Sequence, residues 1–336
     1  MTDKSRVLFL VWAPYSPRSE NISERLDAQI YLISYKFKKK LYSPIKYPFL
    51  LVKTINILRN EKPDVVVCQT PPIFCPLAVQ IYNFIQSKKV KIIIDAHAQT
   101  FRNPWSYFKF LNKLIIRHSY LIIVSSLEIQ DNIKSLYGIN ALVLEDKIPI
   151  FENHKVRSSH NQDRKTNFFN IAVISSFAKD EPISNVLKAA SELSTIFFYI
   201  TGNKSNASKE LVKKKLGNVV FTGFLQQEDY VDLLHFVDAI IVLTDRDETM
   251  LSGAYEAVSA EKPLISSTSL PIRRYFSKGT VYVNNSPSEI KEAIKEVQAK
   301  KEILIEGMRQ LKMQRINEWE NKFESFKSLI MDLEKL

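Results

Sequence analysis

Short apolar runs rich in β-branched residues recur along this chain, and most are followed by a stretch with helical spacing. In the first half the runs are RVLFLVW, PDVVVCQ, KIIIDAH and YLIIVSS. In the second half they are FNIAVISS, TIFFYITG, NVVFTG, AIIVLT, PLISS and TVYVNN. Each is long enough for a buried strand and far shorter than the roughly 18 residues of a membrane span. The alternation predicts an α/β protein whose parallel sheets carry helices on both faces.

A polar segment separates the two series of strands. Residues 152–167, ENHKVRSSHNQDRKTN, contain few apolar side chains and are typical of an interdomain linker. We therefore predict an N-terminal domain over residues 1–165 and a C-terminal domain over residues 166–310, both doubly wound. In residues 311–336 apolar side chains recur at steps of three or four, which predicts a helix with one buried face.

The positive charge lies in the first half of the chain. Residues 1–165 contain 25 Lys and Arg and 13 Asp and Glu, a net +12, whereas the remainder has 22 and 23, a net −1. Residues 35–59 contain no acid and interleave aromatic residues with lysines. This pattern indicates peripheral contact with an anionic membrane, or else a solvated lysine-rich face. Nucleic acid is disfavoured as a partner because the chain has no nucleic-acid-binding motif and its second half is neutral.

The two cysteines, Cys68 and Cys75, indicate a reducing compartment. Two cysteines this close together form a poor disulfide framework for a chain of 336 residues. The additional His and Cys ligands that a zinc site needs are not near them in the sequence. The apolar run Val7–Ala13 has seven residues and is typical of a first strand rather than a signal peptide. We expect a cytoplasmic protein that can bind at the inner face of the cell membrane.

The most specific pattern lies in residues 218–265. It has an Asn-Val strand ending at Gly223, an amphipathic helix, an apolar strand, Glu248, seven residues, Glu256, and Lys-Pro before the next strand. The order and spacing resemble the donor half of family 4-type glycosyltransferases, the glycosyl transferases group 1. This resemblance implies the GT-B fold, in which two Rossmann-like domains face a cleft. It also implies an N-terminal acceptor domain, a C-terminal donor domain and a last helix that returns to the N-terminal domain.

The resemblance implies a retaining, metal-independent transfer from a nucleotide diphosphate sugar, which is a substrate rather than a cofactor. Glu248 would accept hydrogen bonds from the donor sugar and Glu256 from the ribose, since carboxylates offer only acceptors. The amides at the start of the following helix would hold the pyrophosphate, and Gly253 would let it approach closely. The other expected donor contacts are Gly223, Phe224, Met250, Leu251 and Ser252. The alternative is that both glutamates are solvated acids favoured by the helix dipole.

Candidate residues for the reaction also follow other strands. His97 ends the run KIIIDAH, and His97 and Glu248 are the candidate catalytic residues, although a lone histidine is more often structural. Asp95, two residues earlier, would orient His97 or cap the next segment. Ser16 and Arg18 follow the first strand, and with Asp95 we assign them to the acceptor or phosphate side of the site.

The diphosphate also needs cations. The family pattern has an Arg and a Lys after the first strand of the second domain, but VISSFAKDEPISNVL offers only Lys179. Arg246 or Arg18 would supply the missing charge. A rival motif is the Asp245 and Asp247 pair of the triplet DRD, which could chelate a divalent metal. The surrounding pattern favours metal-free binding.

These features together predict a hexosyltransferase-type enzyme that acts on a glycan or lipid-linked acceptor in cell-surface polysaccharide or glycolipid synthesis. Two alternatives stay open. The chain could be a sugar-nucleotide epimerase of the same fold, or a non-catalytic partner subunit that keeps the fold.

Overall fold

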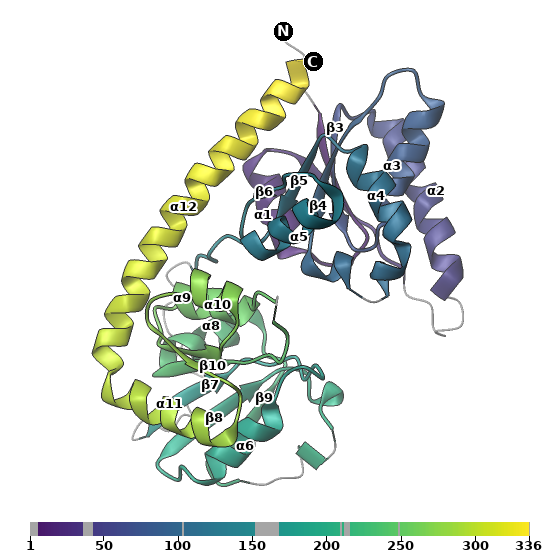
Figure 1. Ribbon diagram of the computed structural model, residues 1–336. Helices are drawn as coiled ribbons and strands as arrows, with labels where there is room; N and C mark the ends of the chain where they lie inside the picture. Colours follow the sequence, from purple (N-terminus) through teal and green to yellow (C-terminus); the bar gives the residue numbers. More distant parts are fainter. Residues whose placement is uncertain are drawn as a thin grey trace. The chain divides into compact units, whose positions relative to one another are not determined.

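The computed structural model describes residues 6–35, 43–102, 104–151, 168–208, 210–211, 216–247 and 249–335. The chain divides into two compact units (Figure 1). The first unit is Met1–Lys147 with Trp319–Leu336, and the second is Ile148–Glu318. The predicted linker, residues 152–167, lies outside the described residues.

The first unit is built on a six-stranded parallel sheet with the strand order β2-β1-β3-β4-β5-β6. Its strands are β1 (Val7–Val11), β2 (Gln29–Leu32), β3 (Val65–Thr70), β4 (Lys91–Ala96), β5 (Leu121–Val124) and β6 (Leu142–Val143). The four apolar runs of the sequence form β1, β3, β4 and β5. The sequence did not predict β2, which is largely exposed, or β6, which has two residues.

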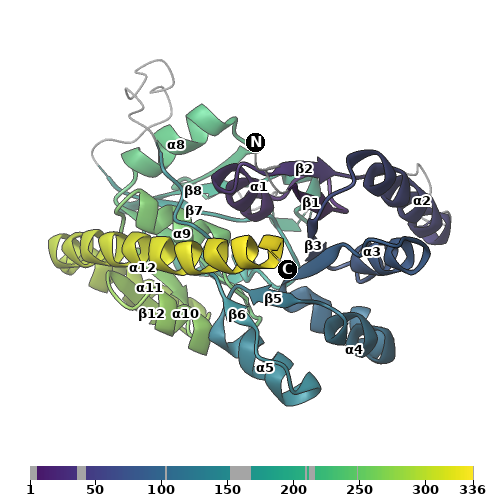
Figure 2. The ribbon, with the colours of Figure 1, turned by 90° about the horizontal axis from the view of Figure 1, so that it is seen from above.

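Helices cover both faces of this sheet (Figures 1 and 2). They are α1 (Pro17–Arg25), α2 (Ser43–Glu61), α3 (Phe74–Ile85), α4 (Lys109–Arg117) and α5 (Leu127–Tyr137), with the 3-10 turns η2 (Ala98–Phe101) and η3 (Trp105–Phe108). Alternate residues of each strand point to opposite faces. Leu8 and Leu10 therefore pack with α2 to α5, whereas Phe9 packs with α1 and the last helix. Both faces are buried, which explains the nearly continuous apolar runs.

The second unit repeats this design with another six-stranded parallel sheet, in the order β12-β11-β10-β7-β8-β9. Its strands are β7 (Phe169–Val173), β8 (Ile196–Thr201), β9 (Val219–Gly223), β10 (Ala239–Val242), β11 (Leu264–Ser267) and β12 (Thr280–Val283). Its helices include α6 (Ile183–Ser191), α8 (Gln227–Phe236), α9 (Ser252–Ser259), α10 (Leu270–Tyr275) and α11 (Pro287–Ala299), with the 3-10 turn η5 (Lys204–Asn206). All six strands predicted for this half are present, which confirms the α/β fold class.

The last helix, α12 (Lys301–Lys335), begins in the second unit and ends in the first. Its apolar face meets the first sheet through Trp319 and Phe323, whose rings stack at 5.0 Å. The indole nitrogen of Trp319 donates to the carbonyl oxygen of Glu145 at 3.0 Å, and Lys322 pairs with the Glu145 carboxylate at 2.6 Å. The prediction of a helix with one buried face that returns to the first domain is confirmed.

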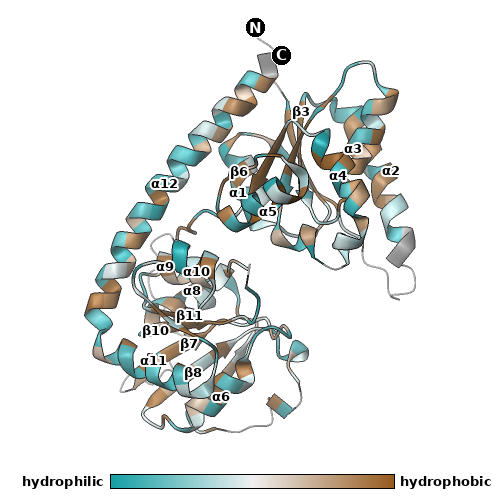
Figure 3. Cartoon of the chain, in the orientation of Figure 1, coloured by the Kyte–Doolittle hydropathy of each residue, from teal (hydrophilic) through white to brown (hydrophobic). Residues whose placement is uncertain are grey.

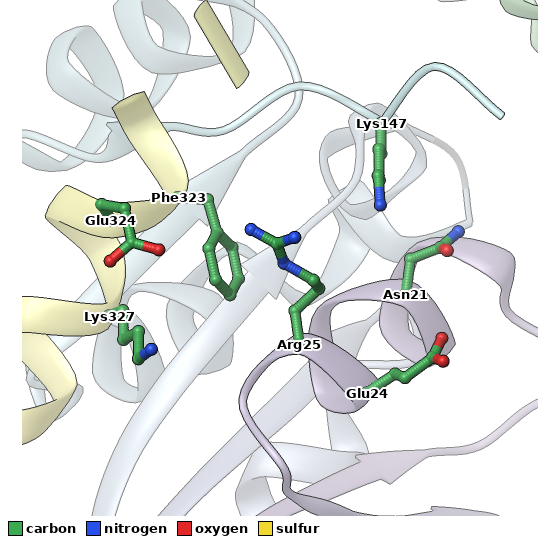
Figure 4. A pocket seen from close by; sticks show the side chains of 7 residues that line it. All are labelled: Asn21, Glu24, Arg25, Lys147, Phe323, Glu324 and Lys327. Carbon is green, nitrogen blue, oxygen red and sulfur yellow. The ribbon is translucent and has the colours of Figure 1, made fainter. Parts of the chain in front are cut away.

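A cavity of about 460 Å³ lies between α1 and α12 in the first unit (Figure 4). Its lining comprises Asn21, Glu24, Arg25, Lys147, Phe323, Glu324 and Lys327. The guanidinium of Arg25 lies 5.1 Å from the centre of the Phe323 ring, a cation–π contact. The cavity contains none of the residues that the sequence singled out as a site.

The strands of both sheets are the most hydrophobic segments of the molecule, and the helices alternate between polar and apolar residues (Figure 3). Among the described residues, no helix combines the length and the apolar character that a bilayer crossing requires.

Candidate functional site

The second sheet changes direction between β7 and β10, because β8 and β9 extend it on one side and β11 and β12 on the other. Ligands of such sheets bind at this switch point, beyond the carboxyl ends of the strands. Two loops meet there, residues 174–182 after β7 and residues 243–251 after β10. The switch point therefore brings together the segments that contain Lys179, Arg246 and the start of α9.

The loop after β7 is held in shape by one of its own carboxylates. Glu181 accepts hydrogen bonds from the Ser175 hydroxyl at 2.6 Å, the Ser176 amide at 2.9 Å and the Ser176 hydroxyl at 2.7 Å. Glu181 is thereby occupied within the loop. Lys179 is exposed and makes no ion pair with another described residue, and it stays the predicted cation of this loop.

Asp180 joins the two loops. Its carboxylate accepts from the Thr244 hydroxyl at 2.8 Å and lies 2.9 Å from Nη2 of Arg246, and its carbonyl oxygen accepts from the Asp245 amide at 2.7 Å. Arg246 is half exposed in this pair. Arg246, one of the predicted cations, therefore lies at the switch point, where it pairs with Asp180.

The rival metal motif has a different set of contacts. Asp245 accepts from Nδ2 of Asn285 at 2.8 Å, and Asp247 is exposed. Among the described residues, no three His, Cys, Asp or Glu side chains gather as a possible metal-binding group. Metal independence stays a prediction.

Helix α9 begins at Ser252, and its N-cap residue, Leu251, has no polar side chain to occupy the first amides. Ser252 is exposed, whereas Met250 and Leu251 pack against the core of the unit. A Cβ on Gly253 would lie 2.9 Å from Cγ2 and 3.0 Å from Cδ1 of Ile174. The glycine thus permits close packing of α9 on the end of β7. This contact is a packing reason for the glycine, and the close approach of a ligand stays a prediction.

The predicted ribose ligand, Glu256, lies one turn further along α9. It is partly buried and accepts a hydrogen bond from the Tyr230 hydroxyl of α8. Burial raises the pKa of the Glu256 carboxyl, and the hydrogen bond from Tyr230 limits that rise. Burial and the nearby carboxylate also raise the pKa of Tyr230. Glu256 is therefore a carboxylate held by a neighbour, rather than a freely solvated acid.

Three predicted donor residues remain. Glu248 lies outside the described residues. Gly223 ends β9 with φ +81° and accepts at its carbonyl oxygen from the Gly202 amide at 3.1 Å. Phe224 follows it with 78 % of its surface exposed, so its ring is free to stack on a ligand.

In the first unit the structure brings Arg18, Asp95 and His97 together, with one residue that the sequence did not indicate. Nε of Arg18 lies 2.9 Å from Oδ1 of Asp95, and Nη1 lies 2.9 Å from Oδ1 of Asp146. Nε2 of His97 lies 3.6 Å from Oδ2 of Asp95. Asp146 was missed because it follows β6, whose two residues make no recognisable run.

These contacts give Arg18 partners within its own unit, and its role at the donor diphosphate stays a prediction. The side chain is buried, and two carboxylates neutralise it within its own unit. Burial would raise the pKa of Asp95, but Arg18 and His97 hold it below its usual range. Burial would lower the pKa of Arg18, but Asp95 and Asp146 raise it. Both groups are therefore ionised and paired.

Ser16 has a structural role at the same end of the sheet. It is the N-cap of α1 and accepts from the Ser19 amide at 3.4 Å. The Ser19 hydroxyl in turn donates to Oε1 of Gln69, at the end of β3, at 3.2 Å. Ser16 thus lies at the switch point between β1 and β3, and its assignment to the acceptor or phosphate side stays a prediction.

The family model described as glycosyl transferases group 1 matches residues 155–314. This part of the chain is a glycosyl transferases group 1 domain. It contains the switch point of the second unit, with Lys179, Arg246 and Glu256. The prediction of a glycosyltransferase is confirmed at this level. A search of curated proteins finds no match.

Solved structures similar to the whole chain include three distant ones. A sucrose-phosphate synthase from Thermosynechococcus elongatus has 11% identity and a TM-score of 0.74, covering 98% of this chain and 99% of the other. Anabaena HepE in complex with UDP and glucose has 13% identity and a TM-score of 0.71, covering 98% of both chains. A glycosyltransferase from Rickettsia africae has 14% identity and a TM-score of 0.73, covering 99% of both. These similarities confirm the GT-B fold over the full length.

Proposed function

We propose that this glycosyltransferase takes its sugar from a nucleotide diphosphate sugar bound at the carboxyl ends of the second sheet. The observation that carries the proposal is the start of α9, which combines uncapped amides at Ser252 and Gly253 with the carboxylate of Glu256. Backbone amides at a helix start bind phosphate, and a carboxylate binds the ribose diol. The UDP in the Anabaena structure supports a nucleotide as ligand of this fold.

The residues have distinct roles in this proposal. The α9 amides and Lys179 bind the diphosphate, and Arg246 can leave Asp180 to join them. Glu256 accepts from the ribose, Phe224 stacks on the base, and Glu248 accepts from sugar hydroxyls. Met250 and Leu251 fix the loop against the core, while Gly223 sets the turn before Phe224.

The proposed reaction retains the anomeric configuration and needs no metal. The bond between the anomeric carbon and the diphosphate oxygen breaks, and the acceptor oxygen bonds to that carbon. The acceptor's proton passes to the leaving diphosphate, whose negative charge the α9 amides and Lys179 stabilise. His97 contacts the sugar, with Asp95 orienting its ring. The acceptor is a glycan or a lipid-linked sugar in cell-surface polysaccharide or glycolipid synthesis, and the enzyme works in the cytoplasm at the inner face of the membrane.

Calorimetric titration with UDP, GDP and their sugar conjugates, with and without magnesium, tests the donor site. We expect one nucleotide to bind without magnesium and Glu256→Ala to weaken it by about 10- to 100-fold, because a charged hydrogen-bond acceptor is lost. Glu292→Ala, which removes an exposed carboxylate on α11, is the matched control and should bind normally. Absence of binding by the wild type would favour a non-catalytic partner subunit. A requirement for magnesium would return Asp245 and Asp247 to consideration.

A further inference from the structure

Two neighbouring helices of the first unit expose large apolar side chains to solvent. Phe84 is 89 % exposed, Phe110 83 % and Tyr107 78 %. We call the surface that they share the α3–α4 face; it comprises Ile81, Phe84, Ile85, Tyr107, Phe108, Phe110 and Leu114. Isolated exposed apolar residues are normal, but a contiguous group on adjacent elements marks an interaction surface.

The spacing of these residues puts an apolar row on the outer side of each of two adjoining helices. On α4, Asn112, Ile115 and Ile116 are buried, so Phe110 and Leu114 point to solvent on the opposite side, one turn apart. On α3, Ala78, Val79 and Tyr82 are buried, and Ile81, Phe84 and Ile85 form the outer row. Nε2 of Gln80 on α3 donates to the Ile115 carbonyl oxygen of α4 at 3.1 Å, so the two helices adjoin. Brown and teal segments alternate along both (Figure 3).

Cations outnumber acids around this face, although α5, which adjoins α4, carries Glu128 and Asp131. Between residues 65 and 127 the single acid is Asp95, which is buried and paired with Arg18. The same range contains seven Lys and Arg. Of these, the exposed ones on or beside α3 and α4 are Lys88, Lys89, Lys109, Lys113 and Arg117. Lys88 pairs with Asp64, which leaves the other four to attract an anionic partner. Lys113 and Arg117 share the outer side of α4 with Phe110 and Leu114. This excess of cations beside apolar side chains suits a partner that is both apolar and anionic.

Helix α2, which packs beside α3, extends the pattern. Tyr47 of α2 meets Phe74 of α3 at 4.9 Å between ring centres. The exposed side of α2 carries Phe49, Val52 and Lys53, and residues 28–60 contain no acid. Of the membrane-contacting segment predicted at 35–59, residues 36–42 lie outside the described residues.

We propose that the α3–α4 face docks on an anionic lipid bilayer, with Phe84, Phe110 and Tyr107 entering the headgroup region and the surrounding cations facing lipid phosphates. Aromatic and aliphatic side chains beside Lys and Arg suit this interface. A second copy of the chain would bring like charges together. A nucleic acid would stack on aromatic rings, but it gains little from Ile81, Ile85 and Leu114. The docking does not depend on sugar transfer.

Co-sedimentation with vesicles tests the proposal without donor or acceptor. The purified chain is mixed with vesicles of phosphatidylcholine alone or with added phosphatidylglycerol. We expect partition onto the anionic vesicles, weakened by salt. The double variant Phe84→Ser/Phe110→Ser should reduce the partition coefficient at least about tenfold, since two apolar rings no longer leave water. Lys109→Gln/Lys113→Gln should reduce it about fivefold per charge on anionic vesicles.

Ile303→Ser is the matched control, because Ile303 is an apolar residue of α12 that is 74 % exposed and belongs to the second unit. It should partition like the wild type, and thermal unfolding and UDP titration of all variants verify that they are folded. Loss of binding confined to the α3–α4 variants supports the docking surface. The proposal is overturned if the wild type does not bind anionic vesicles or if the serine variant binds as tightly. It is also overturned if the face instead mediates dimers or RNA binding in lipid-free sedimentation.

Discussion

In the first unit Arg18 lies buried between Asp95 and Asp146, whereas in the second unit Arg246 lies half exposed beside Asp180. Both arginines are near the carboxyl ends of parallel strands, and the sequence predicts that either one could bind the diphosphate. Their surroundings differ. A buried guanidinium cannot lose its carboxylates without a large desolvation penalty. Arg246 is half exposed, so its guanidinium stays in contact with water when it leaves Asp180. The comparison therefore favours a stabilising role for Arg18, and Arg246 stays the predicted cation for a ligand.

The largest expected effect comes from removing the two arginines in turn. Arg18→Gln leaves Asp95 buried without its main counter-charge and should lower the free energy of unfolding by about 3–5 kcal/mol. Arg246→Gln, the matched variant, should lower it by at most about 1 kcal/mol. Urea denaturation of both variants measures the difference. Equal losses would mean that the two pairs are equivalent and that the contrast between the units has no energetic basis.

The stability contributed by the ion pair of Arg18 and Asp95 depends on pH, and the sign of this dependence follows from the pKa of Asp95. Because its pKa is lowered in the folded state, its stabilising contribution is present above the unfolded value and is lost as the pH falls through the folded one. The difference in the free energy of unfolding between the wild type and Arg18→Gln should therefore shrink below about pH 4. A gap that stays constant there would show that Asp95 is not the group left unpaired.

The sequence predicted the strands better than the partners of its polar residues. Buried β-branched runs predict β7 to β12 directly. In contrast, β2 was missed because it is largely exposed, and β6 was missed because it has two residues. The partners of Arg18 lie 77 and 128 positions away. Local patterns carry no information on such distances. The same holds for Gly253, because its neighbour Ile174 comes from another strand's end.

A second test separates packing from ligand approach at Gly253. Gly253→Ala places a Cβ about 2.9 Å from Ile174, and such overpacking should cost about 1–3 kcal/mol of stability. Since that Cβ points at Ile174, the UDP affinity of the folded protein should change little. Gly217→Ala is the control, because its added Cβ meets nothing within 4 Å. Unchanged stability with lost UDP affinity would restore ligand approach as the reason for the glycine.

The smallest effect concerns Glu256, which differs from the carboxylate of Asp95 in the direction of its shift. Burial raises the pKa of Glu256, so this carboxylate is protonated more readily as the pH falls. In Asp95, Arg18 opposes the effect of burial and keeps the pKa low. If the ionised carboxylate binds ribose, UDP affinity falls as the pH drops through this raised value.

Tyr230→Phe removes the hydroxyl that donates to Glu256, so the carboxylate becomes harder to ionise. The midpoint of the affinity loss should then move to higher pH, by about one unit or less for one hydrogen bond. Calorimetric titration with UDP across the acidic range measures both midpoints. A midpoint that moves down in Tyr230→Phe would mean that the tyrosine does not stabilise the ionised carboxylate, and an affinity without pH dependence would remove Glu256 from the site.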